Sequence, residues 1–245
     1  MHPDEYRKLA KVEDRMWYFR ALNRRVVHWL ARMGVTGPAR VLDAGCGTGG
    51  LINYLRAANA EWRLEGLDFM PQACEMARQR TGKEIAQGSI TALPFADGVF
   101  DAVVSADVVC QVDDGVLALR EFARCVRPGG VVLVNVPAFM WLWSYHDDTC
   151  ETKHRYARPE LADLFRAAGL AVEFASYANM LPLPFIAARR KIFRPAKPTS
   201  DVQLYPAPIE MIFSALAWFE FQWTQFGWPM PIGSSVFVVG RKIGA

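Results

Sequence analysis

The chain has 245 residues, 52% of them hydrophobic, which is enough for a substantial buried core in one domain. Its formal net charge of +3 is too small for charge-driven nucleic-acid binding, so we expect no nucleic-acid partner. The N-terminus lacks the apolar run of a signal peptide, and the five cysteines form no CxxC pair. Both features indicate a cytoplasmic protein with reduced thiols.

The first expected element is a helical segment over residues 5–33. Trp17, Tyr18 and Phe19 make it unusually aromatic for a surface helix. Such a segment either closes over a ligand or packs into the core. We treat residues 1–36 as an N-terminal helical lid.

Between residues 39 and 136, short β-branched runs alternate with helical stretches, the pattern of βαβ units in a parallel sheet. Strands are expected at residues 40–43, 63–67, 84–87, 102–105 and 131–136. Helices are expected at 50–58, 71–80 and 113–125. A helix at 159–168, a strand at 171–175 and a final strand at 234–242 complete the pattern, so that residues 37–177 and 234–245 form one core.

Residues 178–233 differ from the core in composition, since they hold eight of the fifteen prolines and three tryptophans. We interpret them as an insertion on the substrate side. Residues 182–197 are apolar and then basic, and residues 209–231 are apolar around most of a helical circumference but too short to span a membrane. Four interpretations stay open: an apolar substrate pocket with a cationic rim, peripheral membrane contact, a homodimer interface, or plain core.

A glycine loop follows the first expected strand. Asp43 directly precedes three alternating glycines, Gly45, Gly47 and Gly49, where a side chain would obstruct the approach of a ligand to the backbone. The spacing differs from the dinucleotide pattern G-x-G-x-x-G, and a carboxylate beside the loop repels a pyrophosphate but attracts a cation. The loop therefore favours a cationic ligand with a ribose over NAD.

Four motifs follow one another in order: D-x-G-x-G-x-G, "GLDF", "ALPFADGVFDAVVSADV" and "VRPGG". This order closely resembles the class I S-adenosylmethionine-dependent methyltransferases, and within them the type 11 group, over residues 35–136. The resemblance implies an α/β, Rossmann-like fold with a seven-stranded, mostly parallel sheet, helices on both faces and an antiparallel last strand. It also implies S-adenosyl-L-methionine as the cofactor.

The resemblance further implies a set of cofactor contacts. The glycines would pack against the aminocarboxypropyl and ribose part, Asp43 would face the ammonium group, and Asp68 would accept hydrogen bonds from the ribose hydroxyls. Ser89 stands where the family commonly has an aspartate facing the adenine. The remaining expected contacts are Phe69, Met70 and Ile90 around the adenine, Ala106 at the methionine end, and Trp17, Tyr18 and Arg20 in the lid, by likeness of "MWYFRALNRR" to a subset of bacterial members.

Polar residues concentrate after the fifth expected strand, in "VPAFMWLWSYHDDTCETKHRY". A histidine beside a carboxylate is suited to be a general base, so His146 with Asp147 is one candidate, and His154 with Tyr156 is another. The alternative is a polar loop or helix cap whose side chains form hydrogen bonds to their neighbours and have no catalytic role. No compact metal motif is present, and we expect no metal.

We therefore expect methyl transfer to O, N or C of a small hydrophobic or amphipathic acceptor, such as a lipid intermediate or a natural product of secondary metabolism. Two alternatives stay open. An NAD-dependent oxidoreductase conflicts with the glycine spacing and with Asp43. A non-catalytic cofactor-binding or interaction protein on the same fold would follow if the departures at Ser89 and Gln111 abolish binding.

Overall fold

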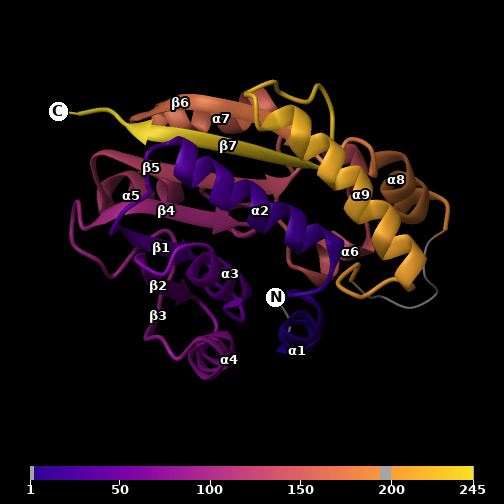
Figure 1. Cartoon of the computed structure of the whole chain (residues 1–245), viewed down its shortest axis with the longest axis horizontal. Helices are drawn as coiled ribbons and strands as arrows, with labels where there is room; N and C mark the ends of the chain where they lie inside the picture. Colours follow the sequence, from indigo (N-terminus) through magenta and orange to yellow (C-terminus); the bar gives the residue numbers. More distant parts are fainter. Residues whose placement is uncertain (1–2, 194–199, 245) are drawn as a thin grey trace.

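The computed structural model describes residues 3–193 and 200–244, which fold around one mixed sheet (Figure 1). The strand order is β3-β2-β1-β4-β5-β7-β6, and among the described strands β7 alone runs antiparallel to its neighbours. This confirms the expected seven-stranded, mostly parallel sheet. The strands are β1 (Arg40–Ala44), β2 (Arg63–Asp68), β3 (Ile85–Gln87), β4 (Phe100–Ala106), β5 (Val126–Pro137), β6 (Leu170–Ala178) and β7 (Ser235–Lys242).

Helices cover both faces of the sheet, because successive side chains of each strand point to opposite faces. Val41 packs with α2 and α3, whereas its neighbour Leu42 packs with α5 and α7. The helices are α1 (Pro3–Val12), α2 (Trp17–Arg32), α3 (Gly50–Ala58), α4 (Pro71–Thr81), α5 (Gly115–Cys125), α6 (Tyr145–Thr149), α7 (Arg158–Ala167), α8 (Leu183–Lys191) and α9 (Ala207–Thr224). Two short 3-10 turns, η1 (Val109–Gln111) and η2 (Met140–Leu142), follow β4 and β5.

Two local expectations differ from the structure. The single N-terminal helical segment is broken into α1 and α2, because Glu13 turns inward to Thr48 and Arg80 and the backbone N–H of Trp17 donates to Glu210 at 2.8 Å. The "RPGG" sequence lies inside β5, which begins directly after α5.

The predicted insertion at residues 178–233 contains α8 and α9, and α9 lies along α2 (Figure 1). The chain then enters the sheet as β7, between β5 and β6. This return needs a glycine, since a Cβ at Gly233 would lie 2.1 Å from the carbonyl oxygen of Ala178. Residues 194–197 of the predicted basic segment lie outside the described residues. Among the described helices, none has the length and apolar character needed to cross a membrane.

A fully buried ion pair fixes α6 beneath the ends of β5 and β7. The Arg155 guanidinium donates to Asp147 at 2.7 Å, to the carbonyl of Ala138 at 2.8 Å and to that of Ser234 at 3.4 Å. The other oxygen of Asp147 accepts the backbone N–H of Ser144 at 2.9 Å, which caps α6. One buried carboxylate thus neutralises a buried arginine and begins a helix.

We predict that Asp147→Ala lowers the free energy of unfolding by about 3 to 5 kcal/mol, because it leaves the buried charge of Arg155 without a partner. Urea unfolding followed by circular dichroism measures the loss. The control is Asp148→Ala at the next position, where the exposed carboxylate accepts from the Trp143 indole and should matter by less than about 1 kcal/mol. Equal losses in the two variants would contradict the structural role of the buried pair.

Candidate functional site

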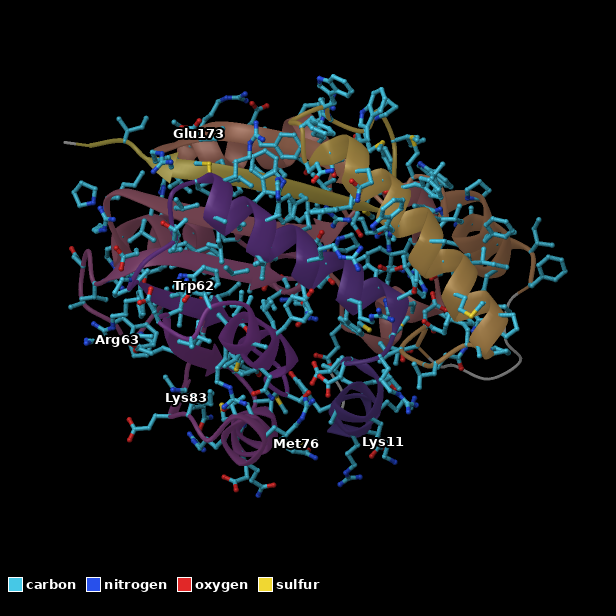
Figure 2. All side chains as sticks on the ribbon, in the orientation of Figure 1. Lys11, Trp62, Arg63, Met76, Lys83 and Glu173 are labelled. Atoms are coloured by element: carbon cyan, nitrogen blue, oxygen red, sulfur yellow. The ribbon has the colours of Figure 1, made fainter. Side chains whose placement is uncertain are left out.

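A cavity of about 720 Å³ opens at the carboxyl ends of β1, β2 and β4. The N-terminal helices α1 and α2 contribute to one part of its wall, and α6, α8 and Asp201 contribute to another. Charged side chains such as Lys11, Lys83 and Glu173 lie at the periphery of the molecule (Figure 2), in contrast to the carboxylates buried in this cavity. In a parallel sheet, this edge is where ligands bind.

The glycine loop approaches the cavity through two of its three glycines. Gly45 has φ 92°, and a Cβ there would lie 2.3 Å from Val108. Gly47 has φ 54° and donates its N–H to Asp68 at 2.9 Å. Gly49, which we expected at the cofactor, does not line the cavity; a Cβ there would lie 2.6 Å from Thr81, so it lets α3 pack closely on α4.

Two acidic residues flank this loop. Asp43 is buried, and within the described part of the chain its Oδ2 has no hydrogen-bond partner. Burial, and then the charge of Asp68, raise the pKa of Asp43 to about 8. Burial also raises the pKa of Asp68, although N–H groups of Met70 and Gly47 and the hydroxyl of Tyr6 donate to its carboxylate and oppose the shift. The loop is thus rich in carboxylate oxygen and poor in cations.

A third carboxylate, Asp107, follows β4 in a left-handed conformation with φ 60°. The Tyr18 hydroxyl donates to it at 2.7 Å, and the Asn135 amide donates to its other oxygen at 2.9 Å. Burial raises the pKa of Asp107, while these two bonds act to lower it. The contact ties the lid helix α2 to the ends of β4 and β5.

Most of the predicted cofactor residues meet in this cavity. The exception besides Gly49 is Arg20, which is exposed on α2 and faces away from the cavity. Phe69 is 69% exposed, so it borders the cavity from its rim. The predicted residues that line it are Trp17, Tyr18, Asp43, Gly45, Gly47, Asp68, Phe69, Met70, Ser89, Ile90 and Ala106.

The four catalytic candidates are divided by the structure. His146 and Asp147 line the cavity. His154 and Tyr156 do not: His154 is partly exposed and pairs with Glu160 at 2.6 Å, and its ring packs edge-on against Tyr156. Asp147 is committed to Arg155 and Ser144, so it does not orient the imidazole of His146 as a base would require.

The geometry of His146 does not support a general base. Its Nδ1 accepts the backbone N–H of Asp201 at 3.1 Å, so the neutral ring carries its proton on Nε2. Burial and the nearby Arg190 lower the pKa of His146 to about 4. At neutral pH His146 is therefore a hydrogen-bond donor.

Several lining residues were not expected as site residues. Tyr6 and Glu13 come from α1 and the turn after it, and Asp201 comes from the predicted insertion. Asn135, whose amide donates to Asp107, could have been recognised in the sequence, because it is the polar residue in the apolar run "VVLVNVP" of β5. Tyr6, Glu13 and Asp201 lie in segments without such a contrast.

Comparison with known proteins shows that the chain is similar to methyltransferases. Residues 42–134 match a family model described as a methyltransferase domain. The chain is 34% identical over 145 residues to malonyl-[acyl-carrier protein] O-methyltransferase of Pseudescherichia vulneris, covering 56% of this chain and 57% of the relative. It is 37% identical over 106 residues to demethylmenaquinone methyltransferase of Bacillus licheniformis, covering 41% and 46%. The chain thus spans about half the length of these curated relatives.

Solved structures share the fold over more of the chain. A chain from the complex of the Haloferax volcanii Trm112 methyltransferase activator with a methyltransferase superposes with a TM-score of 0.65 at 24% identity, covering 98% of this chain and 96% of that one. Geranyl diphosphate C-methyltransferase of Streptomyces coelicolor, solved with S-adenosyl-L-homocysteine, gives a TM-score of 0.61 at 16% identity, covering 90% and 77%. Residues 42–134 are thus similar to a methyltransferase domain, and the chain shares its fold with these solved methyltransferases.

Proposed function

We propose that this protein transfers the methyl group of S-adenosyl-L-methionine to a small hydrophobic or amphipathic acceptor. The observation that carries the proposal is the unpartnered, buried Oδ2 of Asp43 beside Gly45 and Gly47. A buried carboxylate whose pKa is raised to about 8 is stabilised in its charged form by a cation, and the cofactor supplies an ammonium and a sulfonium. The residues present therefore fit this cofactor.

The other contacts follow from the arrangement around Asp43. We assign Asp68 to the ribose hydroxyls, because a carboxylate at the end of β2 accepts hydrogen bonds from a ribose in this class of fold. Phe69, Met70 and Ile90 are assigned to the adenine, with Ser89 as a hydrogen-bonding partner. Trp17 and Tyr18 are assigned to the lid, where Tyr18 is already held by Asp107.

The sulfonium methyl leaves by in-line displacement, so the main task of the chain is to align the acceptor and to exclude water. Apolar side chains of the N-terminal helical region and of residues 178–233, such as Leu9, Met16 and Ile186, line the cavity and are suited to bind a hydrophobic acceptor. The relatives and neighbours name malonyl-[acyl-carrier protein], demethylmenaquinone and geranyl diphosphate as their own acceptors. These differ too much to select one for this chain.

Calorimetric titration tests the cofactor assignment. We expect S-adenosyl-L-methionine and S-adenosyl-L-homocysteine to bind and NAD not to bind. Asp68→Ala should weaken binding by about 1 to 3 kcal/mol, the scale of a hydrogen bond to a charged group. Asp163→Ala, at an exposed acid on α7, is the matched control and should have no effect. Preference for NAD would refute the proposal, and unchanged affinity of Asp68→Ala would remove the ribose assignment.

A second experiment tests the pairing of Asp43 with the ammonium group by measuring how ligand affinity depends on pH. Because its pKa is raised to about 8, Asp43 holds a proton in the unliganded protein at pH 6 and must release it to pair with an ammonium group. The affinity for S-adenosyl-L-homocysteine should therefore rise as the pH rises from 6 to 8, with proton release visible as a dependence of the binding enthalpy on the buffer. Asp43→Asn should abolish both effects. A wild-type affinity that does not change over this range would contradict the pairing.

The outer face of α9 favours a membrane surface as the place where the protein binds its acceptor. Both acidic residues of this helix turn inward: Glu210 accepts from the backbone of Trp17, and Glu220 accepts from that of Asn179 at 2.8 Å. The exposed large side chains of α9 are all apolar, namely Ile209, Met211, Ile212, Trp218, Phe219 and Trp223. Apolar faces with exposed tryptophan are typical of helices that lie in a bilayer interface.

Cations flank this apolar face, which favours an anionic bilayer over a second copy of the chain. Arg24 lies 5.8 Å above the Phe221 ring, and Arg32 donates to the carbonyl of Gln225 at 2.9 Å. Lys191 is exposed at the end of the adjacent α8. An apolar centre with basic neighbours is complementary to a surface of anionic lipid.

We predict that the protein sediments with vesicles of phosphatidylglycerol and phosphatidylcholine, and less with phosphatidylcholine alone. The double variant Trp218→Ser, Phe219→Ser should lose most of this binding. Leu117→Ser, at an exposed leucine on α5, is the control and should retain it. If the wild type instead forms a dimer that the double variant dissociates, α9 is a subunit interface and the membrane proposal fails.

A further inference from the structure

Two adjacent arginines on α8 share a single carboxylate inside the cavity. The Nε of Arg189 donates to one oxygen of Asp201 at 3.1 Å, and the Nε of Arg190 donates to the other at 2.9 Å. Although burial acts to raise it, Arg190, His146 and the Tyr145 hydroxyl hold the pKa of Asp201 at about 2. Two fixed positive charges therefore face one negative charge.

Two other acids close to this wall are themselves paired. Asp147, which also acts on the ring of His146, is neutralised by Arg155 at 2.7 Å. Glu5, whose carboxylate accepts from Ser200 beside Asp201, is paired with Lys8 at 2.5 Å. The side chain of Arg190 is only 9% exposed, so its charge is poorly screened by water. The wall formed by Arg189, Arg190 and Asp201 thus carries a net positive charge of one.

The same wall presents donors that lack an acceptor. In residues 3–193 and 200–244, neither Nη atom of Arg189 or Arg190 has a hydrogen-bond acceptor, since both side chains reach Asp201 through Nε. Among the described residues, the Nε2 of His146 contacts the Cys150 sulfur at 4.0 Å and no oxygen acceptor. Guanidinium donors bind planar pairs of oxygen atoms in a bidentate manner.

We propose that the Arg189–Arg190 pair, with His146 as a third donor, binds an anionic group of the methyl acceptor, a carboxylate or a phosphate. The acceptor is then an anionic amphiphile, with its charged group at α8 and its apolar part against the lid. This inference rests on the proposed methyl transfer, because the bound molecule is an acceptor only if the protein transfers a methyl group. The binding of the anion itself does not depend on it.

The position of the wall supports this division of the cavity. Asp43 belongs to β1 and Asp68 to β2, whereas Arg189 and Arg190 belong to α8, which Figure 1 shows across the molecule from the β1 and β2 labels. One part of the cavity is therefore acidic and another is basic. A cationic donor and an anionic acceptor would each be attracted to its own part and repelled from the other.

Calorimetry with three probes of equal chain length tests the inference. Octyl phosphate, octanoate and octan-1-ol are titrated into the whole protein, with and without saturating S-adenosyl-L-homocysteine. At least one anionic probe should bind the wild type about 10-fold or more tighter than the alcohol does. Arg190→Gln should weaken anion binding about 10- to 100-fold and leave octan-1-ol unchanged.

Two further variants separate charge from folding. Arg190→Lys keeps the positive charge and should restore part of the anion affinity. Arg120→Gln removes an exposed charge of α5 that does not line the cavity and should leave the affinities for all three probes unchanged. Octanoate and octyl phosphate distinguish a carboxylate site from a phosphate site.

Equal affinity of the wild type for the anions and the alcohol, or no anion binding at all, would overturn the inference. So would an Arg190→Gln variant that weakens all three probes equally. Anion selectivity without binding of S-adenosyl-L-homocysteine would refute methyl transfer but leave the anion site standing. Binding of S-adenosyl-L-homocysteine without anion selectivity would refute the anion site and leave the proposed methyl transfer standing.

Discussion

Three buried carboxylates stand at the carboxyl ends of neighbouring strands, and the arrangement of the cavity depends on how each is compensated. Asp68 accepts backbone N–H groups, and Asp107 accepts from Tyr18 and Asn135. Asp43 has one oxygen without a partner in the described chain and a pKa raised to about 8. Parallel strands cannot avoid this proximity, because their carboxyl ends meet at one edge.

The compensation of these acids links the lid to the sheet. Tyr6 and Tyr18 reach Asp68 and Asp107 from two different helices, so the lid is held by the same groups that form the floor. A ligand that binds Asp68 competes with the weak 3.4 Å contact from Tyr6, whereas the 2.7 Å contact of Tyr18 lies one strand away. A ligand at Asp68 is therefore expected to displace the hydroxyl of Tyr6 and to leave that of Tyr18 in place.

The parts of the fold and site with a local signal were predictable from sequence. The glycine loop, Asp43 and Asp68 follow from strand–turn–helix patterning, and so do the strands themselves. Gly49 and Arg20, which we expected at the cofactor, do not line the cavity, because packing sets their surroundings: a Cβ at Gly49 would meet Thr81 on α4, and Arg20 is exposed on α2. The contact of Asp201 with Arg190 joins an irregular segment to a helix, and no periodicity in the sequence encodes it.

The described part of residues 178–233 borders both the interior of the protein and its outer surface. Helices α8 and α9 each present one face inward and another face outward. On α8, Ile186 and Arg190 line the cavity, while Phe185 on another face is 58% exposed. On α9, the acids turn inward to cap backbone N–H groups and the apolar side chains turn outward. The inner face is apolar as well, because Phe213 and Ala217 pack with Trp17, so α9 is apolar around most of its circumference. Glu210 and Glu220 are stable at this inner face because backbone N–H groups donate to both oxygens of each carboxylate, and the exposed large side chains that remain on α9 are apolar.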